Sequence, residues 1–445
     1  MSVERNPRII LLVVLAGLVG YIYFYLKPGQ APEVETKPKV FTVESAKIEE
    51  LQITGTKGET AALKKAGDAW QLQSPVQASA DENEVMGIVT NLSTLENQRT
   101  VDENPADLAA YGLAKPRVQV AFRTAGDKYF TRLLLGDKTA TGADLYAKIP
   151  SEKKVFLVSA FLEATFDRTP FDLRNKEILA FARDKVDRVE VASKDQTVAV
   201  AKDGDRWRLT APLAARADTT VVDGLIGRIQ GGRMKTIESA APSAADLTVF
   251  GLDKPFATVT LGAGSTRATL SVGKAAPDGT TYYARDAARP MVFTVEKSLG
   301  DDLVKKPADY RMKDVFEFRP FMASRLEVTR GGATTIFEKA KGKDGVEKWT
   351  QSSPKKDVDA AKVETLLSSL AGLQVAEYVD ASAKTGIDAP VLAVAVTFDD
   401  GKRQERVTFG RAAGNVYAAR PGEPGAARVE AAKFDEAVAA LDALK

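Results

Sequence analysis

The sequence predicts an α+β fold, with one N-terminal transmembrane helix followed by three tandem repeats, each a mainly antiparallel sheet with packed helices. Three observations predict it. An uncharged, largely apolar run, Ile9–Leu26, lies near the start of the chain. The chain has three tryptophans, Trp70, Trp207 and Trp349, at nearly equal intervals. Around each tryptophan, strand-like alternation and helix-like periodicity form separate blocks, which favours α+β over a strictly alternating α/β fold.

The apolar run has the length of a membrane-spanning helix. At about 1.5 Å per residue, a helix over this run spans about 27 Å, close to the ~30 Å hydrocarbon core of a bilayer. Residues 1–8 carry two arginines and are predicted to be a cytoplasmic stub, by the positive-inside rule. A cleaved signal peptide is the alternative, but its apolar region is usually ~7–15 residues long and is followed by a small-residue cleavage site. We therefore expect Ile9–Leu26 to be an uncleaved anchor, with residues 27–40, rich in proline and charge, as a tether to a large extracytoplasmic part.

Four landmarks recur in the same order in three copies. Each copy has a Trp five residues before a Pro, a turn with Gly four residues before a Pro, a strand that ends on Gly, and a Tyr-Ala pair. So long a period indicates whole domains rather than the thin units of a solenoid. We predict repeat domains over 41–181, 182–318 and 319–445. The repeat markers are Trp70, Pro75, Gly112, Pro116 and Gly136; Trp207, Pro212, Gly251, Pro255 and Gly273; and Trp349, Pro354, Gly386, Pro390 and Gly410.

Within each copy, strands come first and an amphipathic helix follows the Trp-to-Pro segment. In the first copy, apolar residues fall at positions 85, 88, 89, 92 and 95, and the third copy repeats the pattern at 363, 366, 367, 370 and 373. Ser79 with Glu82 predicts a capping box for the first helix, while Asp218 and Asp359 are predicted N-caps of the other two. A strand meander and a final helix complete the copy. A connector recurs at 171–181 and 308–318, and we expect it to pack one domain onto the next.

The composition excludes several chemistries. The chain has no cysteine and no histidine, which removes thiolate nucleophiles, disulfides, the commonest metal ligand and the usual proton-transfer side chain. Its net charge of +2 supplies no field to attract nucleic acid. We therefore predict no catalytic residue, no cofactor, no metal site and no nucleic-acid partner.

The markers themselves have structural and functional interpretations. The tryptophans are either stacking platforms for sugar or peptide, or large side chains that anchor the sheet to the helix, and the second interpretation is favoured. Gly112, Gly251 and Gly386 are expected to supply turn conformations with positive φ rather than to bind phosphate, because no P-loop spacing surrounds them.

Charged pairs also have two interpretations. Asp301-Asp302 and Asp399-Asp400 are expected to be solvated turn charges, since no calcium-loop spacing surrounds them. The connector pairs Arg174 with Lys176 and Arg311 with Lys313 either contact acidic partner surfaces or keep the connector soluble, and solubility is the expectation.

At the Trp-to-Pro segment, the amphipathic helix, the Tyr/Phe-Gly-Leu-x-Lys-Pro turn, the strand ending in Gly and the Tyr-Ala strand, the chain resembles the bacterial family called domain of unknown function 4340. The third copy departs from the pattern, with Gln351 in place of Leu and Thr385 in place of the aromatic residue. The resemblance implies an envelope protein encoded beside ABC-2-type transporter subunits of the gliding-motility kind. It offers no catalytic residue to carry over.

Together these features predict a non-catalytic, membrane-anchored scaffold or accessory protein of an ABC-type transporter complex. It is expected to be a single-pass protein of the bacterial inner membrane, with Ile9–Leu26 in the bilayer, the large domain in the periplasm and a transporter permease complex as partner. The alternative is an envelope protein that binds polysaccharide, peptidoglycan or lipid between its repeats; an apolar or aromatic-lined groove would favour it. A carboxylate-based hydrolase is a third possibility, and it requires two facing acids in a cleft.

Overall fold

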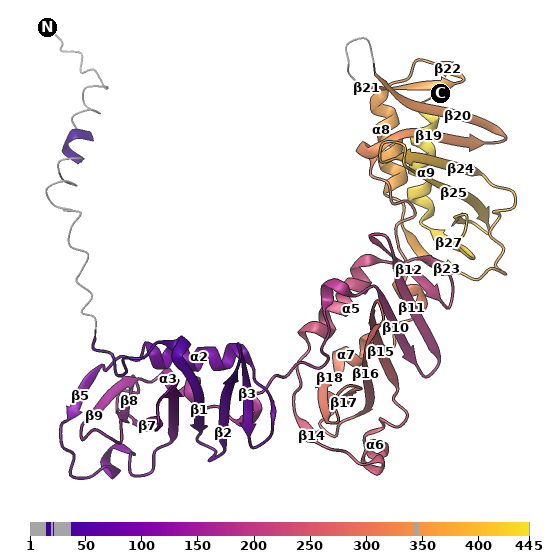
Figure 1. The fold of residues 1–445 in the computed structure, drawn as a ribbon. Coiled ribbons are helices and arrows are strands. Elements are labelled where there is room, and N and C mark those ends of the chain that lie inside the picture. Colours follow the sequence, from indigo (N-terminus) through magenta and orange to yellow (C-terminus); the bar gives the residue numbers. More distant parts are fainter. Residues whose placement is uncertain (1–14, 19–20, 22–36, 342–346, 445) are drawn as a thin grey trace, which may run out of the picture. The chain divides into compact units, whose positions relative to one another are not determined.

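Three nine-stranded sheets follow one another along the chain (Figure 1). The computed structural model describes residues 15–18, 21, 37–341 and 347–444. All strand pairs are antiparallel, and the three sheets have the same strand order, which in the first is β4-β3-β2-β1-β6-β7-β8-β9-β5. The prediction of three tandem repeats with antiparallel sheets is confirmed, although strands so outnumber helices that the fold is mostly β.

Repeat 1 contains the first sheet and the helices packed with it. Its strands are β1 (Ile48–Thr54), β2 (Thr60–Ala66), β3 (Ala69–Ser74), β4 (Ala78–Ser79), β5 (Arg99–Asp102), β6 (Val118–Thr124), β7 (Thr131–Lys138), β8 (Asp144–Lys148) and β9 (Val155–Ser159). Its helices are α2 (Glu82–Ser93), α3 (Leu162–Phe166) and α4 (Pro170–Leu173), with 3-10 turns η1 (Ser45–Lys47) and η2 (Ala109–Tyr111).

Repeat 2 has the same plan. Its strands are β10 (Arg188–Ser193), β11 (Gln196–Asp203), β12 (Arg206–Ala211), β13 (Ala215–Arg216), β14 (Ile237–Ser239), β15 (Ala257–Ala263), β16 (Thr266–Ala275), β17 (Thr281–Asp286) and β18 (Val292–Glu296). Its helices are α5 (Thr219–Gly231), α6 (Ala244–Phe250) and α7 (Lys297–Asp302), with 3-10 turns η3 (Arg183–Lys185) and η4 (Pro307–Tyr310).

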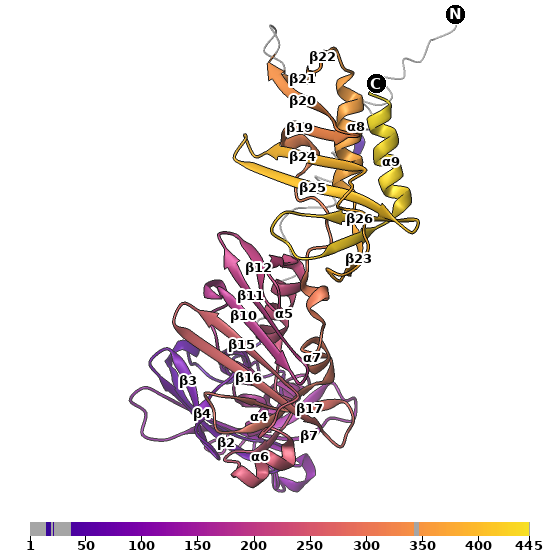
Figure 2. The ribbon, with the colours of Figure 1, turned by 90° about the vertical axis from the view of Figure 1, so that its right-hand side faces the viewer.

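Repeat 3 differs mainly in its last helix. Its strands are β19 (Ala323–Arg330), β20 (Ala333–Lys341), β21 (Glu347–Ser353), β22 (Lys355–Lys356), β23 (Val375–Val379), β24 (Leu392–Phe398), β25 (Arg403–Ala412), β26 (Asn415–Ala419) and β27 (Ala426–Val429). Its helices are α8 (Ala360–Ala371) and α9 (Ala431–Asp442), with the 3-10 turn η5 (Pro320–Met322). Figure 2 shows α8 and α9 side by side on one face of this sheet, whereas the counterparts of α9, α3 and α7, are short.

Alternation along the strands places apolar side chains on the face that the long helix covers. In β1, Ile48, Leu51 and Ile53 are at most 1% exposed, and β1 pairs with both β2 and β6. The helix α2 presents to them the predicted apolar stripe, whose members Val85, Ile88, Val89 and Leu92 are also at most 1% exposed. Each repeat therefore buries one helix stripe against one sheet face, as an amphipathic helix on a half-buried sheet must.

The helix caps are close to the prediction, with one correction. Asp218 and Asp359 cap α5 and α8 through their side chains, as predicted. At α2 the N-cap is Asp81, whose carboxylate accepts from Asn83 N–H and Glu84 N–H, and the predicted box with Ser79 is wrong. Ser79 belongs to strand β4, while the Glu82 carboxylate accepts a bond from Trp70 N–H, so neither residue is free to cap.

The molecule divides into two compact units between Asn175 and Lys176. Unit 1 contains repeat 1, and unit 2 contains repeats 2 and 3 together. The predicted anchor, residues 9–26, lies outside the described residues except for 15–18 and 21, and the predicted tether does so except for its last four residues. In the described part of the chain, no helix combines the length and the apolar character that crossing a bilayer requires.

Candidate functional site

In each repeat, the glycine that ends the strand packs against the backbone of the glycine turn. A Cβ placed on Gly136 would lie 2.1 Å from the Tyr111 carbonyl oxygen, and one on Gly273 would lie 2.3 Å from that of Phe250. Gly410 meets Gly386 in the same way, with its added Cβ 2.4 Å from the Gly386 carbonyl carbon. The glycine at the end of the strand is thus required because the backbone of the glycine turn packs directly on it.

The turn glycines have the positive φ that the sequence predicts, +67° at Gly112, +69° at Gly251 and +70° at Gly386. In repeats 1 and 2 the aromatic residue before the turn glycine packs on the tyrosine of the Tyr-Ala strand. The ring centroids are 5.1 Å apart for Tyr111 with Tyr146 and 4.7 Å apart for Phe250 with Tyr283.

The three tryptophans lie in the cores, at most 3% exposed, so none offers a stacking face. Polar contacts tie two of their strands to the covering helix. Trp207 Nε1 donates to Asp223 of α5 at 3.0 Å, and Trp70 N–H donates to Glu82 of α2 at 2.6 Å. The marker prolines Pro75, Pro212 and Pro354 each follow a cis peptide bond.

The arginines of the two connectors are buried rather than solvated. Arg174 is 8% exposed and Arg311 is 5% exposed, so the expectation that they keep the connector soluble is wrong. The Arg311 guanidinium carbon lies 3.4 Å from the centroid of the Tyr378 ring, and its Nη2 lies 3.3 Å from a Glu423 carboxylate oxygen. The acidic surface that receives Arg311 belongs to repeat 3 of the same chain.

Glu423 is the first centre of a charged junction between repeats 2 and 3. It lies in the β26–β27 loop and pairs with Arg216 of β13 at 2.7 Å, with Arg311 at 3.3 Å and with Arg420 at 3.7 Å. Its side chain is 10% exposed. Burial alone raises the pKa of this carboxyl, but the charges of the surrounding arginines outweigh it and hold the pKa below the usual value near 4.5.

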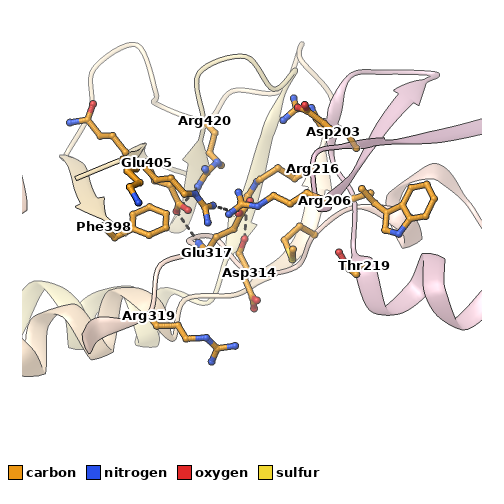
Figure 3. Close-up of a pocket in the computed structure, with 17 residues that line it drawn as sticks. Asp203, Arg206, Arg216, Thr219, Asp314, Glu317, Arg319, Phe398, Glu405 and Arg420 are labelled. Atoms are coloured by element: carbon orange, nitrogen blue, oxygen red, sulfur yellow. Dashed lines mark hydrogen bonds and ion pairs between the residues drawn. The ribbon is translucent and has the colours of Figure 1, made fainter. Parts of the chain in front are cut away.

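Glu317 is the second centre, and it lies in the connector itself. It forms ion pairs with Arg206 of repeat 2, with Arg216 at 3.3 Å and with Arg403 of repeat 3 at 2.9 Å. Figure 3 shows Glu317 among the arginines of both repeats, and Arg319 directed away from them. A single carboxylate therefore joins cations from both sides of the junction.

Glu405 of β25 is the third acid of the junction and the most deeply buried. Its Oε2 accepts from Glu317 N–H at 2.8 Å and from Arg420 Nη1 at 3.3 Å, while its Oε1 has no hydrogen-bond partner among the described residues. Burial raises the pKa of Glu405. Burial and the nearby Arg216 charge lower the pKa of Arg420, whose Nη1 also donates to the Val315 carbonyl at 2.8 Å.

A cleft of about 620 Å³ opens beside these residues. Its lining has more cations than acids: seven basic side chains at positions 206, 208, 216, 319, 402, 403 and 420, against four acidic ones at positions 203, 314, 317 and 405. In the part of the chain that the structure describes, Arg208, Arg319 and Lys402 have no carboxylate partner. The cleft is thus polar and basic, and differs from the apolar or aromatic-lined groove that would favour a neutral sugar or an acyl chain.

The two acid pairs singled out by the sequence lie apart from this junction or at its edge. Asp302 is not solvated as expected, because its side chain is 13% exposed and pairs with Arg228 at 2.6 Å and Lys305 at 2.9 Å. Asp399 and Asp400 form a left-handed turn, with φ near 53° and 54°, and Asp399 pairs with Arg403 at 3.1 Å. Within the described ranges, no three acidic residues gather in a way that would hold a metal ion.

Sequence reasoning from the repeat markers missed the junction residues. The markers are positions at which the copies agree, whereas the junction residues Arg216 and Glu423 lie at positions at which the copies differ. Six residues after the tyrosine of each Tyr-Ala pair, the three copies have Glu152, Arg289 and Glu423. Two residues before each helix N-cap they have Ser79, Arg216 and Asp357. Aligning the copies and looking for charge changes would have found Arg216 and Glu423.

Comparisons with known proteins identify the family. The profile described as "Domain of unknown function (DUF4340)" matches residues 70–206 and 207–390, so each match begins at a marker tryptophan. No curated protein matches the chain.

Among solved structures, a DNA polymerase sliding clamp from Pseudomonas aeruginosa shares 9% identity over 88% of this chain and 93% of its own, with a TM-score of 0.15. A sliding clamp from Bartonella birtlesii shares 8% identity over 87% and 93%, with a TM-score of 0.14. These scores carry no argument about fold or function. The repeats and the profile match agree: the chain belongs to the DUF4340 family.

Proposed function

We propose that the protein is a non-catalytic scaffold that presents its tandem repeats to a partner protein. The observation that supports the proposal is the ion pairing of buried acids with arginines at the junction of repeats 2 and 3. Glu317 and Glu423 are each surrounded by three arginines, and these arginines come from both repeats and the connector. Carboxylates neutralised in this way stabilise an arrangement, whereas a hydrolase needs an acid whose proton is free to exchange with substrate.

The proposal includes a membrane anchor and a transporter partner. The apolar run 9–26 and the proline-rich stretch after it support a single-pass anchor with the repeats in the periplasm. The association with ABC-type transporter subunits that the family resemblance implies supports a permease complex as the partner. The net charge of +2 supports a protein rather than a nucleic-acid partner.

Crosslinking in native membranes followed by affinity purification of the full chain tests the partner. Enrichment of a permease or its ATPase is expected. The Glu423→Gln variant, which weakens the junction, should reduce this enrichment, while Glu152→Gln at the equivalent position of repeat 1 should not. Recovery of the chain without any transporter subunit would remove the transporter from the proposal.

Protease treatment of intact cells and of spheroplasts tests the topology. The repeats should be protected in intact cells and become cleavable when the outer membrane is opened. Protection that persists until the inner membrane is lysed would contradict a periplasmic location.

A second candidate function is supported by the basic cleft. Three basic side chains without carboxylate partners among the described residues favour an anionic envelope polymer or lipid headgroup over a neutral ligand. A variant with Arg208→Gln, Arg319→Gln and Lys402→Gln should lose salt-sensitive binding to an acidic polysaccharide or to vesicles of anionic phospholipid. If the original chain binds neither probe at low ionic strength, this candidate is wrong.

A further inference from the structure

Each connector docks on the repeat that precedes it through one pair of backbone hydrogen bonds. In repeat 1, Asp81 N–H donates to the Leu173 carbonyl at 2.8 Å, and Asn175 N–H donates to the Ser79 carbonyl at 2.8 Å. In repeat 2 the matching bonds join Asp218 N–H to Tyr310 O at 2.8 Å and Met312 N–H to Arg216 O at 3.1 Å. The connector thereby forms a β-bridge beside the short strand at the sheet edge, centred on Ala80 or Ala217.

The bridge also delivers one large apolar side chain to the core. Leu173 is 0% exposed and packs in the core of repeat 1, and Tyr310 is 1% exposed at the same place in repeat 2. An acidic residue, Asp172 or Asp309, precedes each of them and accepts a bond from backbone N–H three residues earlier. The docked segment therefore consists of three parts in order: a turn closed by an aspartate, a buried apolar side chain, and an extended pair of residues that forms the bridge.

Repeat 3 has the equivalent positions, but there the edge strand β22 ends at Lys356, one residue earlier relative to the helix N-cap than β4 and β13 do, and the docking positions are open. The residue two before its helix N-cap is Asp357, and the N-cap is Asp359. Among the described residues, neither the Asp357 carbonyl nor the Asp359 N–H has a hydrogen-bond partner. Val358, between them, is partly exposed, whereas its counterparts Ala80 and Ala217 are buried.

A groove of about 380 Å³ lies beside this open edge. Its lining is mainly apolar and includes Val328, Phe337 and Leu444, with Gln351 and Lys356 at the edge strands. Leu441 of α9 and Leu444 just after the helix reach the groove but leave it unfilled. The exposed Lys355 of β22 adds positive charge at the rim.

We propose that this edge of repeat 3 binds an extended segment of a partner protein in the way that repeats 1 and 2 bind the connectors. The segment bridges Asp357 and Asp359, inserts a leucine or tyrosine into the groove, and has an acidic residue before it that faces Lys355 of β22. This is strand addition to a sheet edge, in which backbone bonds supply affinity and a side-chain pocket supplies selectivity. The inference rests on the proposed scaffold function and defines how the partner is held.

The chain's own connector supplies the probe. A fluorescent peptide with the sequence of residues 305–314, which contains Asp309, Tyr310 and Met312, is titrated into the full chain in detergent. Saturable binding is expected. A peptide with Tyr310→Ser should bind at least tenfold more weakly, because it lacks the apolar anchor. Absence of binding by the original peptide, or equal binding by both peptides, would overturn the proposal.

Two variants of one residue separate the backbone bond from the helix cap. Asp359→Ala and Asp359→Pro both remove the carboxylate cap of α8, but only proline also removes the N–H that the bridge needs. Proline fits the backbone there, since φ of Asp359 is −70°. Peptide binding should persist in Asp359→Ala and fall at least tenfold in Asp359→Pro. Equal binding by the two variants would refute the bridge.

Light scattering identifies the occupant. We expect that the full chain does not self-associate through this edge. Self-association through it would increase with concentration, persist in Asp359→Ala and be lost in Asp359→Pro. Such association would make a second copy the occupant and overturn a distinct partner. Failure of the peptide to bind while a transporter still co-purifies would reject this docking mode and leave the scaffold function in place.

Discussion

Replacing Glu423 by glutamine should loosen repeats 2 and 3 from each other. The change keeps the size of the side chain but removes the charge that faces Arg216 at 2.7 Å and Arg311 at 3.3 Å. Both guanidinium groups are at most 10% exposed, so they stay buried when their partner is lost. Removing one member of a buried ion pair typically costs about 3–5 kcal/mol.

The lower end of that range applies here because Arg216 keeps other partners. Its Nη1 lies 3.3 Å from Glu317, and its Nη2 donates to the Asp314 carbonyl at 3.2 Å. We therefore expect a loss of about 3 kcal/mol in the free energy of unfolding of unit 2. With a urea dependence of about 2–3 kcal/mol per molar, the unfolding midpoint should fall by roughly 1–1.5 M.

Tryptophan fluorescence is a suitable assay because each repeat has one tryptophan. Chains that keep only Trp207 or only Trp349 should show the lower midpoint, and a chain that keeps only Trp70 should not. Glu152→Gln is the matched control, since the Glu152 side chain is 41% exposed and its carboxylate pairs with Lys154 at 3.2 Å, and a partly exposed ion pair of this kind is worth less than about 1 kcal/mol. Equal midpoints for the two variants would refute the reasoning that burial of the junction makes Glu423 important.

The remaining predictions concern pH and glycine packing. Because the folded-state pKa of Glu423 is lowered, its contribution to stability is present above about pH 4.5 and is lost as pH falls through the folded-state pKa. Urea unfolding midpoints measured from about pH 3 to 7 should therefore fall at acid pH in the original chain, and this part of the fall should be absent in Glu423→Gln. Glu405 has a raised pKa, so its contribution is present below about pH 4.5 and lost as pH rises through the folded value; Glu405→Gln should remove that opposite slope, and an unchanged profile would contradict it. Gly136→Ala places a Cβ 2.1 Å from the Tyr111 carbonyl and should destabilise repeat 1 by about 3 kcal/mol in thermal unfolding. Gly87→Ala, in a helix with open space around it, should instead stabilise by about 0.5–1 kcal/mol, and a similar loss in both variants would exclude a specific clash at Gly136.

Local sequence was sufficient to predict the repeated unit. The spacing of Trp70, Trp207 and Trp349 predicts three copies, and the apolar positions of α2 and α8 are the buried ones. Asp218 and Asp359 are predictable as caps because a cap depends on residues a few positions away. The error at α2 has the same scale, because the predicted cap Ser79 lies only two residues before the observed cap Asp81 and instead belongs to strand β4.

The tertiary structure alone decided what the charged residues do. The sequence suggests a solvated Arg311 in the connector, but folding places it against Tyr378 and Glu423, which come much later in the chain and belong to repeat 3. The open edge at Asp359 is likewise visible only when the bonds made by Asp81 and Asp218 are seen beside it. The physical reason is one of range: periodicity and capping are properties of neighbouring residues, whereas burial of a charge and pairing of a sheet edge depend on which distant segments meet.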